Sequence, residues 1–301
     1  MNAVTQVMPH TLINAHQLTV LKFTGGDAAN FLQGQLSNDI NNLNDHWHFS
    51  GYCNPKGRLL ALLTLWKHNE DIYALVPSSI VAAIVKRLRM YVMRSNVVID
   101  IIDNVAISNN FESNLPRFTY SAIDSKHRLS FGGRDLVVDL EPSQANNCVS
   151  NQWTCQNIAD GLPEITNKTM ELFVPQMVNL DLLGGINFKK GCYTGQEIVA
   201  RMHYLGKLKQ RMFVCTISID KNENGDTSYA DNDACQAGDK VSSGDKAIGH
   251  IVSVAGDQVL AVLRVEALSN NATDLAIESL MGKKIRLSIN NTQPYSIELK
   301  T

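Results

Sequence analysis

The sequence KGCYTGQE, residues 190–197, is the most distinctive stretch of the chain. It combines a cysteine, a tyrosine, a glutamine, a glutamate and two glycines, a mixture that no amphipathic pattern requires. Gly191 and Gly195 permit tight backbone geometry next to Cys192. We expect a turn that enters a helix over Gly191 to Arg201, so that free backbone N–H groups lie near the thiol. Lysines and a helix N-terminus favour the thiolate form, and the sequence therefore predicts a reactive Cys192.

The segment around this motif is positively charged. Residues 188–211 contain six basic residues against one acid, Glu197, a net charge of +5. The whole chain has 27 Lys and Arg and 29 Asp and Glu, and its net charge is −2. This balance argues against wide electrostatic capture of nucleic acid and against an anionic membrane as a partner, although the local basic segment keeps nucleic-acid binding open.

Composition and cysteine spacing restrict the class of protein. With 301 residues, of which 44% are hydrophobic and 19% charged, the chain is typical of a soluble globular protein with one large domain or two to three smaller ones. None of the six cysteines forms a C-x-x-C pair, and His46 and His48 have no third candidate ligand nearby, so no metal site is predicted. We see no signal peptide or apolar run long enough to span a membrane, and we expect a cytoplasmic monomer.

Hydrophobic periodicity predicts a mixed α and β organisation followed by a β-rich end. Asp27 is a candidate helix cap, because its carboxylate can accept hydrogen bonds from the first helical turn. From about Gln210 onward, alternating strands separated by turns predict a small barrel or sandwich. The expected helices are 28–35, 78–91 and 153–159, and the expected strands are 18–23, 47–53, 59–66, 72–76, 97–102, 105–107, 136–140, 212–219, 246–254, 258–264 and 284–289.

Three motifs resemble one protein family. Residues 190–197 are similar to the K-G-C-Y-x-G-Q-E signature of the YgfZ family, which comprises folate-binding relatives of the glycine-cleavage T-protein. FLQGQLSND at 31–39 resembles a second family motif, and IADGLP at 158–163, followed by VPQ at 174–176, resembles a third. Bacterial members are known as tRNA-modifying proteins and mitochondrial members as iron–sulfur cluster assembly factors. The resemblance spans roughly 18–211.

The resemblance implies an α+β fold of the T-protein type, a three-domain ring with two intertwined α+β domains and a C-terminal β-barrel around a central channel. The implied domains are a discontinuous folate-binding domain at 1–45 and 104–205, a second α+β domain at 46–103, and the barrel at 206–301.

The resemblance also implies a cofactor, tetrahydrofolate or a derivative, bound on the channel wall. Trp153 matches a folate-contacting tryptophan of the family, and a tryptophan face suits a pterin ring. A second such tryptophan of the family is replaced here by Leu18. We hypothesise that Lys190 or Arg201 pairs with the carboxylates of the folate tail. The other motif residues expected at the cofactor are Tyr193, Gln196 and Glu197.

The implied function is that of a folate-dependent accessory protein for iron–sulfur enzymes. Its partners would include radical-SAM enzymes that methylthiolate tRNA, with a further effect on the initiation of chromosome replication. Cys192 would be the reactive residue, and because one thiolate cannot supply the roughly four ligands of a resident cluster, a stable cluster in the monomer is not expected. A third interpretation is direct tRNA binding, which the basic segment 189–211 invites but the overall acidity and the lack of interleaved aromatic residues argue against.

The alternative function is a folate-dependent one-carbon transferase. The T-protein aspartate needed for that chemistry is missing, because residues 56–63, KGRLLALL, contain no acid and Leu60 or Ala61 occupies its place. We therefore expect no glycine-cleavage activity.

Overall fold

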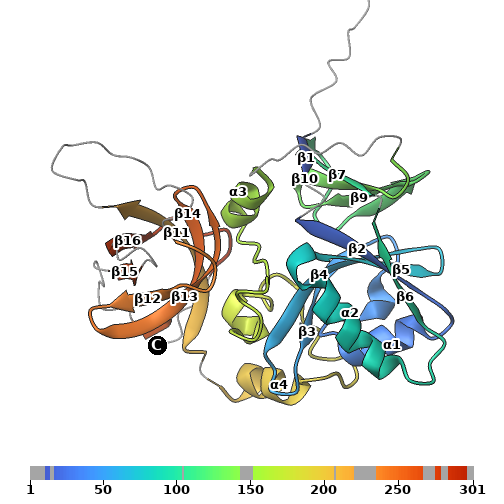
Figure 1. Cartoon of the computed structure of the whole chain (residues 1–301), viewed down its shortest axis with the longest axis horizontal. Helices are drawn as coiled ribbons and strands as arrows, with labels where there is room; N and C mark the ends of the chain where they lie inside the picture. The colour runs from blue at the N-terminus through green and yellow to red at the C-terminus, as the bar shows by residue number, and fades with distance from the viewer. Residues whose placement is uncertain are drawn as a thin grey trace, which may run out of the picture.

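The structure is a computed structural model that describes residues 11–13, 17–103, 105–142, 152–206, 208–219, 235–266, 275–278 and 284–296. It belongs to the α+β class. Two five-stranded sheets lie on one side of the molecule and a closed barrel on the other, with a mostly irregular segment between them (Figure 1). Among the described residues, no helix is long and apolar enough to cross a membrane.

The first sheet has the strand order β3-β4-β5-β2-β6. Helices α1 (Ala28–Gln35) and α2 (Ser78–Val92) share a hydrophobic cluster with this sheet. Each helix buries apolar residues at helical spacing, such as Ile84 and Leu88 in α2. The strands are β2 (Leu18–Thr24), β3 (His48–Cys53), β4 (Leu59–His68), β5 (Asp71–Pro77) and β6 (Val98–Ile102).

Strand β2 lies inside the first sheet. β2 pairs antiparallel with β5 on one side and with β6 on the other. β2 and α1, which the expected division groups with 104–205, pack here with the strands of 46–103, and the division into domains stays a prediction. The reason is that the alternating apolar residues of β2 complete the middle of this sheet.

The second sheet has the order β1-β7-β10-β9-β8 and shares a large core with the first. In this core the Trp66 indole donates a hydrogen bond to His127 Nδ1 at 3.1 Å, and the Tyr120 hydroxyl lies 2.8 Å from the same atom. Trp66 comes from the first sheet, so this polar network joins the two sheets. The strands are β1 (Thr11–Ile13), β7 (Ala106–Ser113), β8 (Tyr120–Ile123), β9 (Lys126–Ser130) and β10 (Gly133–Asp139).

The segment 152–206 connects the sheets to the barrel. It contains α3 (Gln152–Ala159), the short helix η2 (Pro175–Val178) and α4 (Gln196–Tyr204). Arg211 forms a two-pronged ion pair with Asp181 at 2.6 and 2.9 Å, which fixes this segment to the first barrel strand.

The C-terminal part is a closed six-stranded barrel of order β11-β14-β13-β12-β15-β16. The tail that follows β16 returns toward α3, because the Tyr295 hydroxyl donates to the carbonyl of Gly161 at 3.1 Å. The strands are β11 (Gln210–Ile219), β12 (Lys240–Ser243), β13 (Lys246–Ala255), β14 (Gln258–Arg264), β15 (Leu275–Glu278) and β16 (Lys284–Ile289).

Most of the elements expected from the sequence are confirmed, including the three helices 28–35, 78–91 and 153–159 to within a residue. Asp27 is not a side-chain cap for α1. Its carboxylate instead accepts from the backbone N–H of Asn96 at 2.7 Å. The helix expected from Gly191 begins only at Gln196, and strands β1, β8, β9, β12 and β15 were not predicted.

Candidate functional site

Lys190 anchors the KGCYTGQE motif to the end of α1. Its Nζ donates to the backbone carbonyls of Gln33, Leu36 and Asn38 at 2.7, 2.6 and 2.9 Å. Carbonyls at a helix C-terminus carry partial negative charge and lack partners within the helix, so a lysine is well suited to them. Lys190 also lies over the ring of Tyr193, 5.3 Å from its centroid.

These contacts differ from the role expected for Lys190. An ammonium group has three N–H donors, and all three have carbonyl acceptors here. Burial lowers the pKa of Lys190 to about 8, so the charged form still predominates at neutral pH. The structure thus gives Lys190 an anchoring role, and pairing with a folate carboxylate would require these bonds to break.

Gly195 brings the motif against the β3–β4 turn. Its φ is +83°, and a Cβ placed on it would lie 2.5 Å from the Asn54 carbonyl oxygen and 3.0 Å from the Cα of Gly57. Gly57 itself has a φ of +69° and faces Ile198 on α4. The two glycines therefore allow two backbones to approach closely, which fixes where α4 begins.

Gly195→Ala is expected to lower the free energy of unfolding by about 2–3 kcal/mol, because alanine adds both a clash and left-handed strain. Gly191→Ala is the matched control. No atom lies within 4 Å of a Cβ at that position and its φ is not positive, so it should change stability by less than about 0.5 kcal/mol. Chemical unfolding of both variants measures this, and equal losses would contradict the packing described.

The remaining motif residues differ in exposure. Cys192, Glu197 and Arg201 are exposed, Gln196 is half-buried and Tyr193 is buried. Burial raises the pKa of the Tyr193 hydroxyl, so this group stays neutral. Because α4 begins at Gln196, Cys192 lies in the loop before the helix rather than in its first turn. The reactivity expected for Cys192 remains a prediction.

Two adjacent cavities lie near the other predicted site residue, Trp153. A small cavity of about 40 Å³ is lined by Trp153 and also by Leu18, the residue at the second tryptophan position of the family. A larger cavity of about 370 Å³ lies next to it. Glu164 lines both cavities. The structure therefore brings Trp153 and Leu18 together, and the residues that line either cavity include none of 190–201.

Trp153 is held by its neighbours. Its indole N–H donates to Glu164 Oε1 at 3.3 Å, and Phe131 meets its ring edge-on with centroids 5.7 Å apart. The guanidinium of Arg134 lies over the ring, 4.7 Å from the centroid. Arg134 is in turn paired with Asp160 at 2.8 Å. A cavity of about 40 Å³ holds little more than a water molecule, so pterin stacking on Trp153 needs some rearrangement.

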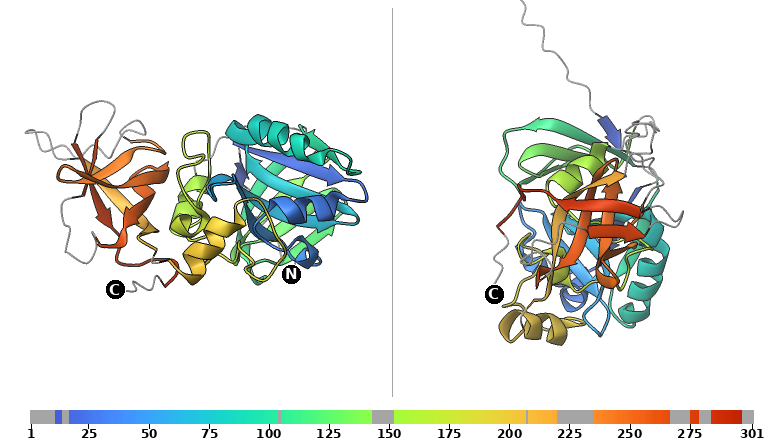
Figure 2. Two further views of the ribbon diagram at one scale, coloured as in Figure 1. Left: turned by 90° about the horizontal axis from the view of Figure 1, so that it is seen from below. Right: turned by 90° about the vertical axis from the view of Figure 1, so that its left-hand side faces the viewer.

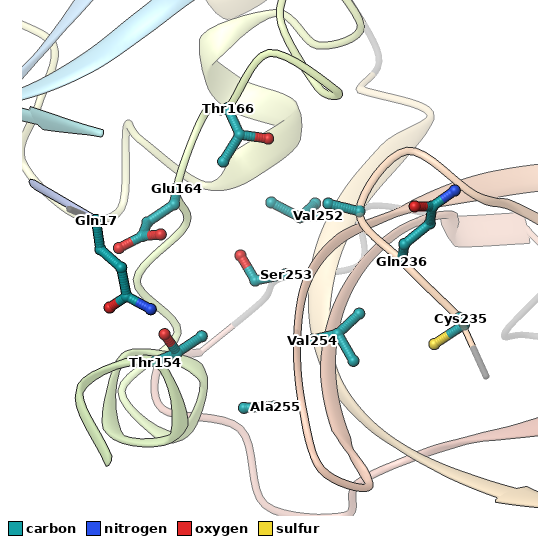
Figure 3. Close-up of a pocket in the computed structure, with 11 residues that line it drawn as sticks. Gln17, Thr154, Glu164, Thr166, Cys235, Gln236, Val252, Ser253, Val254 and Ala255 are labelled. Carbon is teal, nitrogen blue, oxygen red and sulfur yellow. The ribbon is translucent and has the colours of Figure 1, made fainter. Parts of the chain in front are cut away.

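The larger cavity lies between the connecting segment and the barrel (Figure 3). Its size falls within the range of small-molecule sites. Burial raises the pKa of Glu164, and the hydrogen bonds that it accepts from Trp153 and Asn157 act in the opposite direction without cancelling this rise. Gln17, Thr154 and Glu164 gather on one side, and residues of β13 lie on the other (Figure 3). The full lining is Gln17, Thr154, Glu164, Thr166, Cys235, Gln236, Ala237, Val252, Ser253, Val254 and Ala255.

Sequence reasoning missed Glu164, although it directly follows the IADGLP motif.

The two residues expected in place of the T-protein aspartate, Leu60 and Ala61, lie in the protein core. Leu60 and Ala61 are 3% and 0% exposed and belong to the core beneath α1 and α2. Neither side chain can accept or donate a proton.

Comparisons with known proteins agree with this architecture. The family described as CAF17, C-terminal beta-barrel domain, matches residues 217–295. A glycine cleavage system aminomethyltransferase T from Bartonella henselae has a similar structure, with a TM-score of 0.60 at 14% identity, over 95% of this chain and 86% of that one. At such identity the likeness establishes the fold, which is that of the T-protein.

Sequence relatives establish the family. The tRNA-modifying protein YgfZ of Hamiltonella defensa subsp. Acyrthosiphon pisum is 31% identical over 70% of this chain and 71% of its own. That of Enterobacter sp. is 32% identical over 68% and 72%, and that of Colwellia psychrerythraea is 26% identical over 96% and 95%. With three motifs, the T-protein fold and these relatives in agreement, the chain belongs to the YgfZ family of tRNA-modifying proteins.

Proposed function

We propose that this protein is a folate-binding accessory protein that supports iron–sulfur enzymes and, through them, the methylthiolation of tRNA in the cytoplasm, with an indirect effect on the initiation of chromosome replication. The observation that carries the proposal is the cavity of about 370 Å³ whose wall includes the Glu164 carboxyl group. Trp153 donates a hydrogen bond to that carboxyl group. The family's relatives are tRNA-modifying proteins, which supports the tRNA part.

The residues of the larger cavity fit the pterin end of a tetrahydrofolate. A pterin ring carries N–H donors along its aminopyrimidine edge, and a carboxylate is a strong acceptor for them. Gln17, Thr166 and Ser253 add neutral donors and acceptors, and Val252 and Val254 add apolar surface. No lysine or arginine is among the described residues that line either cavity. We therefore propose that the anionic tail of the folate extends beyond the cavity.

Glu164→Gln is expected to weaken tetrahydrofolate binding about tenfold or more, because an amide replaces one oxygen acceptor of the carboxyl group with an N–H donor. Titration calorimetry measures the affinity. Glu197→Gln is the control, since Glu197 is an exposed acid in the KGCYTGQE motif. If Glu197→Gln weakens binding and Glu164→Gln does not, the cofactor binds at the motif and the cavity assignment is wrong.

The iron–sulfur part of the proposal depends on Cys192. An exposed thiol can reach a partner's cluster or its oxidised cysteines, which a buried thiol cannot. Cys53, Cys215 and Cys235 are buried, and burial raises the pKa of each thiol. Cys148 lies outside the described residues.

Cys192→Ala is expected to abolish rescue of tRNA methylthiolation in cells that lack the native protein. Mass spectrometry of digested tRNA measures the modified nucleoside. Cys155→Ala is the matched control, because Cys155 is also an exposed cysteine but lies on α3. Full rescue by Cys192→Ala would remove this thiol from the mechanism.

A further inference from the structure

The loop that carries Cys192 is closed by a cluster of aromatic rings. Phe188 lies before the loop, and its ring stacks on His203 with centroids 3.7 Å apart and 15° between the planes. Tyr204 meets His203 at 4.7 Å and 81°. His203 and Tyr204 form the last residues of α4, so the two ends of the segment 188–204 lie side by side.

This cluster continues into exposed apolar surface. Tyr204 is 65% exposed and Leu205 is 83% exposed, the latter being among the most exposed large apolar side chains of the described residues. α4 lies at the lower edge of the molecule, below the sheets and the barrel (Figure 1), and Figure 2 shows it from two further sides. Exposed apolar groups on the segment that also carries an exposed thiol indicate a surface that contacts another molecule.

Cations border this surface. Lys189 and Arg201 are exposed and belong to the same segment, and Lys209 is exposed at its end. Glu197 is its exposed acid. Lys190 and Arg211 already have partners within the fold. Lys190 donates to carbonyls at the end of α1, and Arg211 pairs with Asp181. Lys207 lies outside the described residues. The described surface thus keeps a modest positive charge around an apolar centre.

We propose that this surface, formed by Phe188, His203, Tyr204 and Leu205 and bordered by Lys189 and Arg201, docks a protein that has an apolar pocket and an acidic rim. The inference rests on the proposed function, since it gives the iron–sulfur client a place to bind on the segment that carries Cys192. Charge complementarity selects the acidic rim. Leu205, the most exposed group of this surface, favours a protein over RNA, because burying a leucine in an apolar pocket is favourable and the described residues of this segment leave few cations to contact phosphates.

The test measures binding of a purified tRNA methylthiotransferase, with its clusters intact, to the full-length protein by biolayer interferometry. Leu205→Ser is expected to weaken binding about tenfold, as at an interface hot spot. Raising the salt from about 0.1 to about 0.3 M should weaken binding of the wild type further. The affinity for tetrahydrofolate and the rate of Cys192 alkylation should not change, since the Leu205 side chain is exposed and its backbone N–H still bonds Arg201.

Ile123→Ser is the matched control, because Ile123 is 75% exposed on β8 of the second sheet. Equal affinities for Leu205→Ser, Ile123→Ser and the wild type would overturn the docking surface. It would also be overturned if Leu205→Ser instead weakened binding of an isolated tRNA anticodon stem-loop. If Cys192→Ala abolishes methylthiolation in cells while Leu205→Ser does not, the docking surface alone is wrong. If neither variant affects methylthiolation, both the docking surface and the role of Cys192 in the proposed function are wrong.

Discussion

Replacing Lys190 with methionine is expected to lower the free energy of unfolding by about 3 kcal/mol. The variant leaves three carbonyls at the end of α1 without their charged donor, and each loss of a charge-assisted hydrogen bond is costly. Burial lowers the pKa of Lys190, which shows that the ammonium itself is enclosed at some cost, so the net loss is smaller than three full bonds. Methionine keeps most of the aliphatic stem.

The matched control is Lys189→Met, one residue earlier. Lys189 is exposed, and its removal should change stability by less than about 0.5 kcal/mol. Urea unfolding gives the stability of both variants, and hydrogen exchange at the α1 amides should accelerate only in Lys190→Met. If the two variants unfold alike while only Lys190→Met loses folate affinity, Lys190 is a ligand-binding residue and its anchoring role is wrong.

Acidification from pH 6.5 to pH 4 is expected to remove up to about 3 kcal/mol of stability through His127. Burial, together with the nearby His68, lowers the pKa of His127 to about 4. Because the Trp66 indole donates to Nδ1, this nitrogen is unprotonated, and the Tyr120 hydroxyl lies 2.8 Å from it. The unfolded chain binds a proton near pH 6.5 and the folded chain only near pH 4, so stability is complete above about pH 6.5 and falls below it.

His127→Phe isolates this contribution, since His48 and His250 also have lowered pKa values. The variant should be less stable than the wild type at pH 7.5, and the difference should shrink as the pH approaches 4. Urea unfolding across this pH range provides the measurement. Parallel stability curves for the two proteins between pH 6.5 and 4 would show that His127 does not titrate as described.

The features that could be predicted from the sequence are those whose information is local. Ile80, Ile84 and Leu88 repeat at helical spacing, and α2 follows that pattern. The Asn54 to Gly57 turn separates two apolar runs, and the β3–β4 hairpin forms there. The three family motifs likewise led to the correct fold class, because each is a short continuous stretch.

The features that could not be predicted depend on partners distant in the chain. The carboxylate of Asp27 bonds to Asn96, 69 residues away, in place of the first turn of α1. The acceptors of Lys190 lie more than a hundred residues before it. Glu164 is an isolated acid in a loop, and it becomes part of a site only because β13 folds against that loop. A pattern of charges in the sequence shows none of these pairings.

The place of β2 in the first sheet has a consequence for biosynthesis. β2 is made before all the other strands of its sheet, yet both of its neighbours, β5 and β6, are made after β3 and β4. Until Val98–Ile102 has left the ribosome, β2 therefore lacks the partner for one of its edges. Unpaired apolar edges attract other chains, so nascent chains that stall within this sheet are expected to be the ones that aggregate or recruit chaperones.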